Sequence, residues 1–254
     1  MIVRTDEERA GLIEAGARLA TVLESLEKAV KPGMKTIELD ALAESLIRER
    51  GDTPAFKGYQ PDGARFPFPG TLCISVNDEV VHGIPGERVL LEGDIVTLDL
   101  GLIHDGFVVD AAVTVPIGTV DATSMRLMDA TRAALDQAIA AARPGNRIGD
   151  ISYATGLAFK GTDFSVVKVL GGHGVGRSVH EDPYIANDGH PGTGPEIVPG
   201  MVLALEPIAN AGKASVLLAN DGYTFRSRDG SRSAHFEHTI LIEEAGTTVL
   251  TGRS

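Results

Sequence analysis

Two long apolar runs joined by a tight turn constrain the fold of this chain more than any other feature. Residues 93–118 read GDIVTLDLGLIHDGFVVDAAVTVPIG, and β-branched residues stand on both sides of Asp105 and Gly106. An Asp-Gly pair between such runs favours a type I′ turn, so this segment predicts an antiparallel β-hairpin. If these two residues form the turn, His104 pairs with Phe107, and the register of the whole hairpin follows.

Two aspartates inside the predicted hairpin are the first candidates for a functional site. Aspartate is depleted in strands, and a buried carboxylate is costly unless it is paired or bound to a metal. The predicted register sets Asp99 opposite Ala112 and Asp110 opposite Gly101, which makes the aspartates diagonal neighbours on one face. Such neighbours have Cα atoms roughly 7–8 Å apart, and a divalent cation removes the repulsion between their charges. The alternative is two solvated acids on an exposed sheet face.

Two glutamates and one histidine occur in comparable surroundings. Glu206 ends the apolar run GMVLALE and is expected in a strand, and the proline after it predicts the edge or the end of that strand. Glu237 is expected in the strand FEHTILI, with His235 and Thr239 on the same face. His173 lies in the glycine-rich run LGGHGVGRSVHE.

Four carboxylates and one imidazole form a ligand set suited to two divalent ions that share carboxylates. This hard set favours Mn²⁺, Fe²⁺ or Co²⁺, with Zn²⁺ as a less suited candidate. The absence of thiolates from the set excludes a zinc-finger type of site. The alternative for each glutamate taken alone is an ordinary solvated strand residue.

Four helices are predicted around these strands. The first follows a capping box in which Thr5 caps the helix and Glu8 reaches back, and it ends before KPG at 31–33. Gly16 falls on its buried face and would let a neighbouring element approach closely. The other helices are expected near residues 36–51, 123–142 and 149–160, with strand and loop afterwards.

A weak internal repeat divides the chain. KPGMKTIELDAL resembles RPGNRIGDISYA, and GDIVTLD ending at Asp99 resembles GMVLALE ending at Glu206. Chance is the alternative for matches this short. If the repeat is real, residues 1–254 form one catalytic domain of two related halves, about 1–120 and 121–254. Their equivalent strands would each deliver an acid to a shared centre.

Composition excludes several classes of protein. A net charge of −12 without a basic stripe argues against a nucleic-acid-binding protein. The single cysteine, Cys73, permits no internal disulfide and fits a reducing compartment. The N-terminus is charged where a signal peptide is apolar, and no uncharged apolar run reaches the roughly 18 residues of a membrane span. We therefore expect a cytoplasmic protein with no membrane or direct nucleic-acid contact.

Five motifs in register resemble the type I methionine aminopeptidases, and the resemblance covers nearly the whole chain. The motifs are CISVNDEVVHGIP, DIVTLDLGLIHDGFVVDAAVT, GGHGVGRSVHE, ALEP and FEHTI. The resemblance implies an α+β pita-bread fold, in which two pseudo-symmetric halves have antiparallel sheet covered by helices. It also implies that Asp110 and Glu237 bridge two metal ions, and that the complete ligand set is Asp99, Asp110, His173, Glu206 and Glu237.

The same resemblance implies an activity. Members of this family remove the N-terminal methionine of nascent proteins and peptides, favour small second residues, and use a metal-bridging hydroxide to attack the scissile carbonyl. His82 would contact the scissile nitrogen, His180 would polarise the carbonyl or stabilise the oxyanion, and Glu206 would help to shuttle the proton. Both histidines would thus bind substrate, together with the pocket residues Tyr59, Phe68, Cys73 and Tyr223. A monomer with transient ribosome contact completes this expectation.

Two positions depart from the family pattern, and two other functions remain as alternatives. Tyr223 stands where tryptophan is common and Val179 where phenylalanine is common, which changes the shape of the pocket and leaves the metal chemistry alone.

An X-Pro aminopeptidase or dipeptidase has the same fold, but such relatives usually carry a large extra N-terminal domain, whereas this chain starts directly with the core. A catalytically silent binding protein on this fold would typically lose metal ligands, and all five are present.

Overall fold

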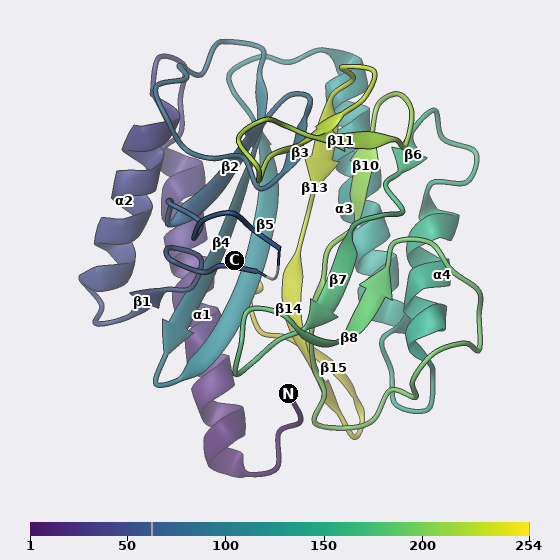
Figure 1. Cartoon of the computed structure of the whole chain (residues 1–254). Helices are drawn as coiled ribbons and strands as arrows, with labels where there is room; N and C mark the ends of the chain where they lie inside the picture. The colour runs from purple at the N-terminus through teal and green to yellow at the C-terminus, as the bar shows by residue number, and fades with distance from the viewer. Residues whose placement is uncertain (62, 254) are drawn as a thin grey trace.

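Four helices flank a set of antiparallel strands in the computed structural model, which describes residues 1–61 and 63–253 (Figure 1). The helices of these described residues are α1 (Asp6–Ala29), α2 (Thr36–Arg48), α3 (Ala122–Ala141) and α4 (Ile148–Ala158). The strands are β1 (Thr53–Pro54), β2 (Leu72–Val76), β3 (Glu79–Val81), β4 (Ile95–His104), β5 (Phe107–Pro116), β6 (Ser165–Val166), β7 (Gly171–Gly174), β8 (Glu181–Ala186), β9 (Val202–Leu205), β10 (Ile208–Asn210), β11 (Val216–Leu218), β12 (Phe225–Ser227), β13 (Ser233–His235), β14 (His238–Glu243) and β15 (Gly246–Val249). The predicted α+β class with antiparallel sheets is confirmed.

The predicted hairpin is formed by β4 and β5, and its register is the expected one. Asp99 lies opposite Ala112, and Gly101 lies opposite Asp110. At the tip, Asp105 and the glycine after it both have positive φ angles, 47° and 78°. Positive φ at both central residues is what a type I′ turn requires. Because the turn lies where the sequence predicts it, Asp99 and Asp110 point to the same face.

The first helix is capped by Thr5 as predicted and is packed closely on its glycine side. The Thr5 hydroxyl accepts from the backbone N–H of Glu8 at 3.2 Å. The Glu8 carboxylate accepts from the N–H of Arg4 at 2.8 Å rather than from that of Thr5, so the second bond of the predicted capping box is shifted by one residue. A Cβ atom added at Gly16 would lie 2.4 Å from the carbonyl oxygen of Leu250. The predicted close approach is therefore confirmed, and its partner is the C-terminal segment.

The two helix pairs are built alike at their turns. At the start of α2 the backbone N–H of Lys35 donates to the Glu38 carboxylate at 2.8 Å. At the start of α4 the N–H of Arg147 donates to the Asp150 carboxylate at 2.7 Å. Both contacts fall in the segments that the sequence repeat aligned. The boundary between the halves near residue 120 stays a prediction.

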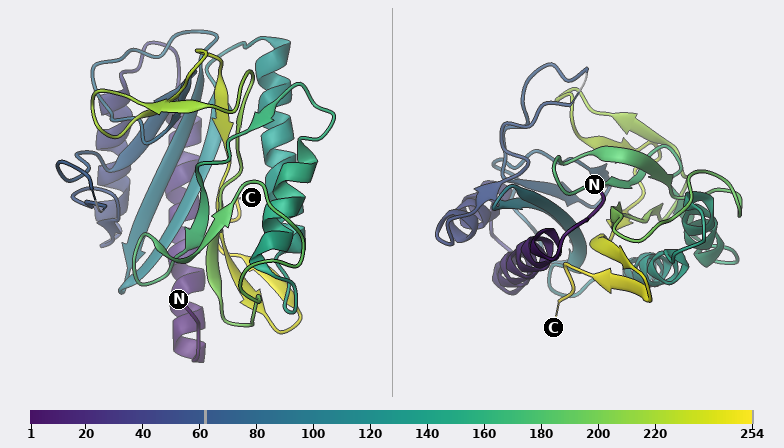
Figure 2. Two further views of the ribbon diagram at one scale, coloured as in Figure 1. Left: turned by 45° about the vertical axis from the view of Figure 1, so that its right-hand side comes forward. Right: turned by 90° about the horizontal axis from the view of Figure 1, so that it is seen from below.

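The strands that surround the site lie between these helix pairs (Figures 1 and 2). One sheet has the order β1-β4-β2, with β5 paired to β4, and α1 packs against β4 and β5. A second sheet has the order β15-β14-β9-β7-β8, and α4 packs against β8. A three-stranded sheet, β13-β10-β6, packs against α3. The helix pairs thus cover opposite sides of the molecule, and the sheets meet between them.

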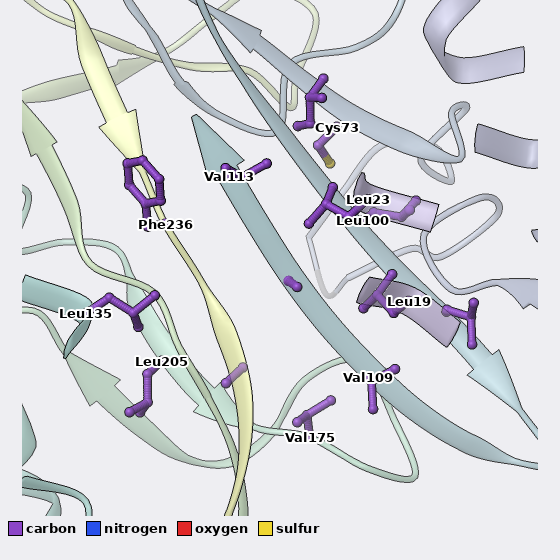
Figure 3. Packing of buried hydrophobic residues seen from close by; sticks show 14 of the residues in the cluster. Leu19, Leu23, Cys73, Leu100, Val109, Val113, Leu135, Val175, Leu205 and Phe236 are labelled. Carbon is purple, nitrogen blue, oxygen red and sulfur yellow. The ribbon is translucent and has the colours of Figure 1, made fainter. Parts of the chain in front are cut away.

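One apolar core runs across the molecule from one helix pair to the other. Figure 3 shows Leu19 and Leu23 of α1 beside the hairpin, with Leu135 of α3, Leu205 of β9 and Phe236 on its other side. Continuous packing of this kind holds the sheets at a fixed distance from each other. Within the described residues, no helix is both long enough and apolar enough to span a bilayer.

Candidate metal centre

All eleven predicted site residues line a single pocket between the sheets. The five predicted metal ligands come from five separate places. Asp99 lies in β4, Asp110 in β5 and His173 in β7. Glu206 directly follows β9, and Glu237 lies between β13 and β14.

Glu206 directly follows the last residue of its strand, as the proline after it predicts, because proline has no N–H with which to continue a ladder. The prediction that Glu237 lies inside a strand is wrong. Glu237 stands where the chain passes from β13 to β14, and its backbone pairs with β5 instead. Its N–H donates to the Ala112 carbonyl at 3.0 Å, and its carbonyl accepts from the Ala112 N–H at 3.4 Å. Both glutamates therefore lie at strand ends, where their side chains reach the pocket.

Several buried polar atoms at this centre have no partner within the protein. One oxygen each of Asp99, Asp110 and Glu237 is buried without a hydrogen bond. Possible ligand atoms of Asp110, His173 and Glu237 all lie within 4.8 Å of one another. Buried carboxylates without partners are costly, and a bound cation satisfies them. The residues present therefore fit a metal centre.

The electrostatics of the four carboxylates indicate the same need. Burial raises the pKa of Asp99 and Glu206 well above the ordinary values of these groups, and the Asp110 charge raises both further. Burial also raises the pKa of Asp110 and Glu237. Carboxylates that crowd each other in this way hold protons unless a cation replaces them.

His173 is arranged as a neutral ligand. Its Nδ1 lies 2.9 Å from the Gly174 carbonyl oxygen, which can only accept, so Nδ1 carries the proton. The lone pair of Nε2 then points toward the carboxylates, 3.8 Å from Glu206 Oε1. Burial lowers the pKa of His173 to about 4, so the imidazole is uncharged at neutral pH. A neutral imidazole held through its other nitrogen is the usual form of a histidine ligand.

The two predicted catalytic histidines flank the carboxylates. His82 follows β3 and has a φ angle of 57°, a conformation that non-glycine residues seldom adopt and that concentrates at functional sites. His180 immediately precedes β8, and its ring lies edge-on to that of His173, with 4.5 Å between the ring centroids. Burial lowers the pKa of His82 to about 4 and also lowers the pKa of His180. Both rings are therefore neutral at pH 7.

The apolar side of the pocket holds the four predicted pocket residues. The Tyr223 ring packs edge-on against Phe68, with centroids 5.2 Å apart, and its hydroxyl donates to the Phe66 carbonyl oxygen. Cys73 lies opposite Asp99 in the β2–β4 ladder, and burial raises the pKa of its thiol. Phe56 and Pro61, which precede β2 in the chain, also line the pocket.

Sequence reasoning missed two contacts at this centre. The Tyr59 hydroxyl lies 2.9 Å from Nδ1 of His180, a link between segments 121 residues apart. His235 Nε2 lies 3.5 Å from Glu206 Oε2 and 3.6 Å from Glu237 Oε2. The placement of His235 on the same face as Glu237 was the only signal for the second contact, and no local pattern indicates the first.

Comparison with known proteins identifies the family. The sequence pattern of Metallopeptidase family M24 matches residues 10–244. Methionine aminopeptidase 1 of Bacillus subtilis is 43% identical over 251 residues, which cover 99% of each chain. The chain belongs to the methionine aminopeptidases of metallopeptidase family M24. Methionine aminopeptidase 1 of Mycobacterium tuberculosis is also similar, at 40% identity over 98% of this chain and 94% of that protein.

Solved structures of similar proteins have the same fold. The crystal structure of methionine aminopeptidase from Thermotoga maritima matches with a TM-score of 0.94 and 40% identity, and each chain is covered completely. Prolidase from Pyrococcus furiosus matches all of this chain and 66% of its own length, with a TM-score of 0.75 and 22% identity. The second match shows a common fold alone. The predicted family and the predicted pita-bread fold are confirmed.

Proposed function

We propose that this protein is a metal-dependent aminopeptidase that removes the N-terminal methionine of nascent proteins and peptides and favours small second residues. The observation that carries the proposal is the pocket itself. Unpartnered carboxylate oxygens and the neutral imidazole of His173 stand beside an apolar recess formed by Phe68, Cys73 and Tyr223. This combination supports binding of an apolar side chain next to a hydrolytic metal centre, and the similar proteins carry the name of this activity.

Two divalent ions would be held at this centre by Asp99, Asp110, His173, Glu206 and Glu237. Mn²⁺, Fe²⁺ and Co²⁺ suit such an oxygen-rich set best, and Zn²⁺ less well. When bound, such ions polarise a carbonyl group and make water a stronger acid.

The hydrogen bond between Tyr59 and His180 gives His180 a defined role. If the Tyr59 hydroxyl donates to Nδ1, the ring proton is on Nε2. Nε2–H can then donate to the carbonyl oxygen of the first peptide bond, where negative charge develops during hydrolysis. His82, which follows β3, would contact the scissile nitrogen. Glu206, whose pKa is raised by burial, can hold the proton that passes to the departing amine.

The pocket wall supports recognition of methionine. Tyr223 is anchored by its hydrogen bond to the Phe66 carbonyl, which fixes the loop against the recess. Val179 lines the same recess and is smaller than phenylalanine. An unbranched thioether side chain fills irregular apolar space of this kind well.

The remaining expectations follow from the resemblance and the composition. They are a cytoplasmic monomer, a polypeptide substrate, transient contact with the ribosome, and no membrane or direct nucleic-acid partner. X-Pro cleavage has no specific observation in its favour, because the similarity to prolidase extends to the fold alone. A silent binding protein would not need the five ligand-type residues that meet in the pocket.

A peptide assay tests the proposed function directly. The protein is stripped with a chelator, and hydrolysis of Met-Ala-Ser is measured before and after addition of Mn²⁺, Co²⁺, Fe²⁺ or Zn²⁺. We expect activity to return with Mn²⁺ or Co²⁺, because both ions suit the carboxylate-rich set. An Ala-Pro peptide serves as the control and should not be cleaved. No turnover of Met-Ala-Ser with any of these ions, or preferred cleavage of Ala-Pro, would contradict the proposal.

A further inference from the structure

His235 is a buried histidine that none of the roles above accounts for. It ends β13, and only 1% of its surface is exposed. Neither of its ring nitrogens has a hydrogen-bond partner in the protein. Buried polar groups are nearly always hydrogen-bonded, so an imidazole with two unpartnered nitrogens indicates a partner outside the ordinary core packing.

The backbone of His235 is anchored independently of its ring. Its N–H donates to the Thr114 hydroxyl oxygen at 2.9 Å, and the same hydroxyl donates to the His235 carbonyl at 2.8 Å. His235 also pairs with Ile208 of β10, two residues after Glu206. These contacts hold the ring at one place in the centre, between the segments that carry Glu206 and Glu237.

The groups that face the ring are those of the metal centre. Nε2 lies 3.5 Å from Glu206 Oε2 and 3.6 Å from Glu237 Oε2. Carboxylate oxygens accept hydrogen bonds, and an imidazole N–H donates them. A movement of roughly 0.3–0.4 Å would bring Nε2 within ordinary hydrogen-bond distance of either glutamate.

We propose that His235 is a positioning residue of the metal centre, whose Nε2–H donates to the facing oxygens of Glu206 and Glu237 and holds both glutamates in the orientation they need as ligands. This inference rests on the metal centre of the proposed function. Partners that orient ligating carboxylates typically contribute about 10–100-fold to metal affinity. The residue acts through the two glutamates and touches neither substrate nor ion.

Calorimetric titration of chelator-stripped protein with Mn²⁺ tests the inference. We expect His235→Ala to weaken the affinity for at least one ion by about 10–100-fold. His235→Gln, whose side-chain amide can also donate, should recover most of this loss. His238→Gln is the matched control, because this neighbouring, half-buried histidine bonds to the Thr251 hydroxyl at 2.9 Å and lies outside the ligand set. Its affinity should equal that of the wild type.

Nitrogen NMR of histidine-labelled, Zn²⁺-loaded wild type provides a readout that needs no variant. A protonated Nε2 on His235 is the expected result, and an unprotonated, metal-bound Nε2 would overturn the inference by making His235 a ligand. Equal Mn²⁺ affinity of wild type and His235→Ala would also overturn it. If the wild type itself binds no divalent ion, the proposed function fails first, so the two failures are distinguishable.

Discussion

At the scale of single residues, the candidate metal centre is recognisable because charged side chains lie where strands normally carry apolar ones. Asp99 and Asp110 occupy the middle of apolar strands, where both are buried and one oxygen of each lacks a partner. A carboxylate at such a position destabilises the fold unless it is protonated or bound to a cation. Their burial without partners therefore supports the proposed role in metal binding.

The residue-scale prediction concerns Asp99→Asn. We expect this variant to lose turnover and to bind one ion more weakly while remaining folded, because the amide preserves the shape of the side chain. A competing structural role would show as a lower melting temperature and intact turnover of Met-Ala-Ser. A fully active variant would contradict the assignment of Asp99 as a ligand.

The same variant has a defined pH dependence when metal is removed. Burial raises the folded-state pKa of Asp99, so its protonated form is favoured in the fold. The preferred protonation of Asp99 in the folded state stabilises the fold. This contribution is fully present below the unfolded-state pKa of about 3.9 and is lost as the pH rises through the raised folded-state pKa. Metal-free Asp99→Asn should therefore have a higher melting temperature than metal-free wild type at pH 8. This difference in melting temperature should be smaller at pH 5. Melting curves at both pH values measure it.

At the scale of elements, the position of His173 depends on how closely the backbone of β7 packs against β8 and β9. A Cβ atom at Gly172 would lie 2.2 Å from the Ala204 carbonyl oxygen of β9, and one at Gly171 would lie 2.4 Å from the Ile185 carbonyl oxygen of β8. His173 itself pairs with Ala204. The glycines thus give β7 the room to lie close to both strands, which places the imidazole against the carboxylates.

The element-scale prediction is that Gly172→Ala separates β7 from β9. We expect it to destabilise the protein by about 1–3 kcal/mol, as overpacking in a dense core does, and to reduce metal affinity because His173 moves. Chemical denaturation and Mn²⁺ titration measure the two effects. Gly86→Ala is the control, since a Cβ atom there meets nothing within 4 Å. Equal changes of stability in both variants would contradict this prediction, because the smaller backbone freedom of alanine is common to both and by itself stabilises the fold.

At the scale of the whole molecule, the metal centre joins segments that are distant in the sequence. Its predicted ligands extend from Asp99 to Glu237 and come from the hairpin, from β7 and from the ends of β9 and β13. One continuous core holds these segments in place. A metal ion that binds only the folded state, through residues from all of these segments, raises the free energy of unfolding of the whole molecule.

The whole-molecule prediction is a concentration-dependent rise in melting temperature when Mn²⁺ is added to stripped protein. At about 100 times the dissociation constant, binding adds roughly 2.7 kcal/mol of stability. Each kcal/mol corresponds to roughly 2–4 °C for a chain of this size. Calorimetry should show one cooperative transition that moves upward, with a smaller shift for Asp99→Asn. A melting temperature that does not respond to the ion would contradict a centre shared by both sheets.

The sequence by itself determined the four helices, the β4–β5 hairpin and the family. The hairpin register follows from the Asp-Gly turn and from the alternation of side chains along a strand. The helix ends follow from capping residues and from the glycines that end helices, so both features can be predicted from short segments. The candidate ligands stood out because a carboxylate in an apolar run is an exception to a local rule.

Only the tertiary structure decided which atoms meet. The displacement of Glu237 from a strand onto the backbone of Ala112, the bond from Tyr59 to His180 and the place of His235 between two glutamates each join distant segments. Such contacts depend on how the whole core packs, and a difference of about one methylene in that packing shifts them. No local pattern contains that information, because local patterns record periodicity and turns rather than the distance between sheets.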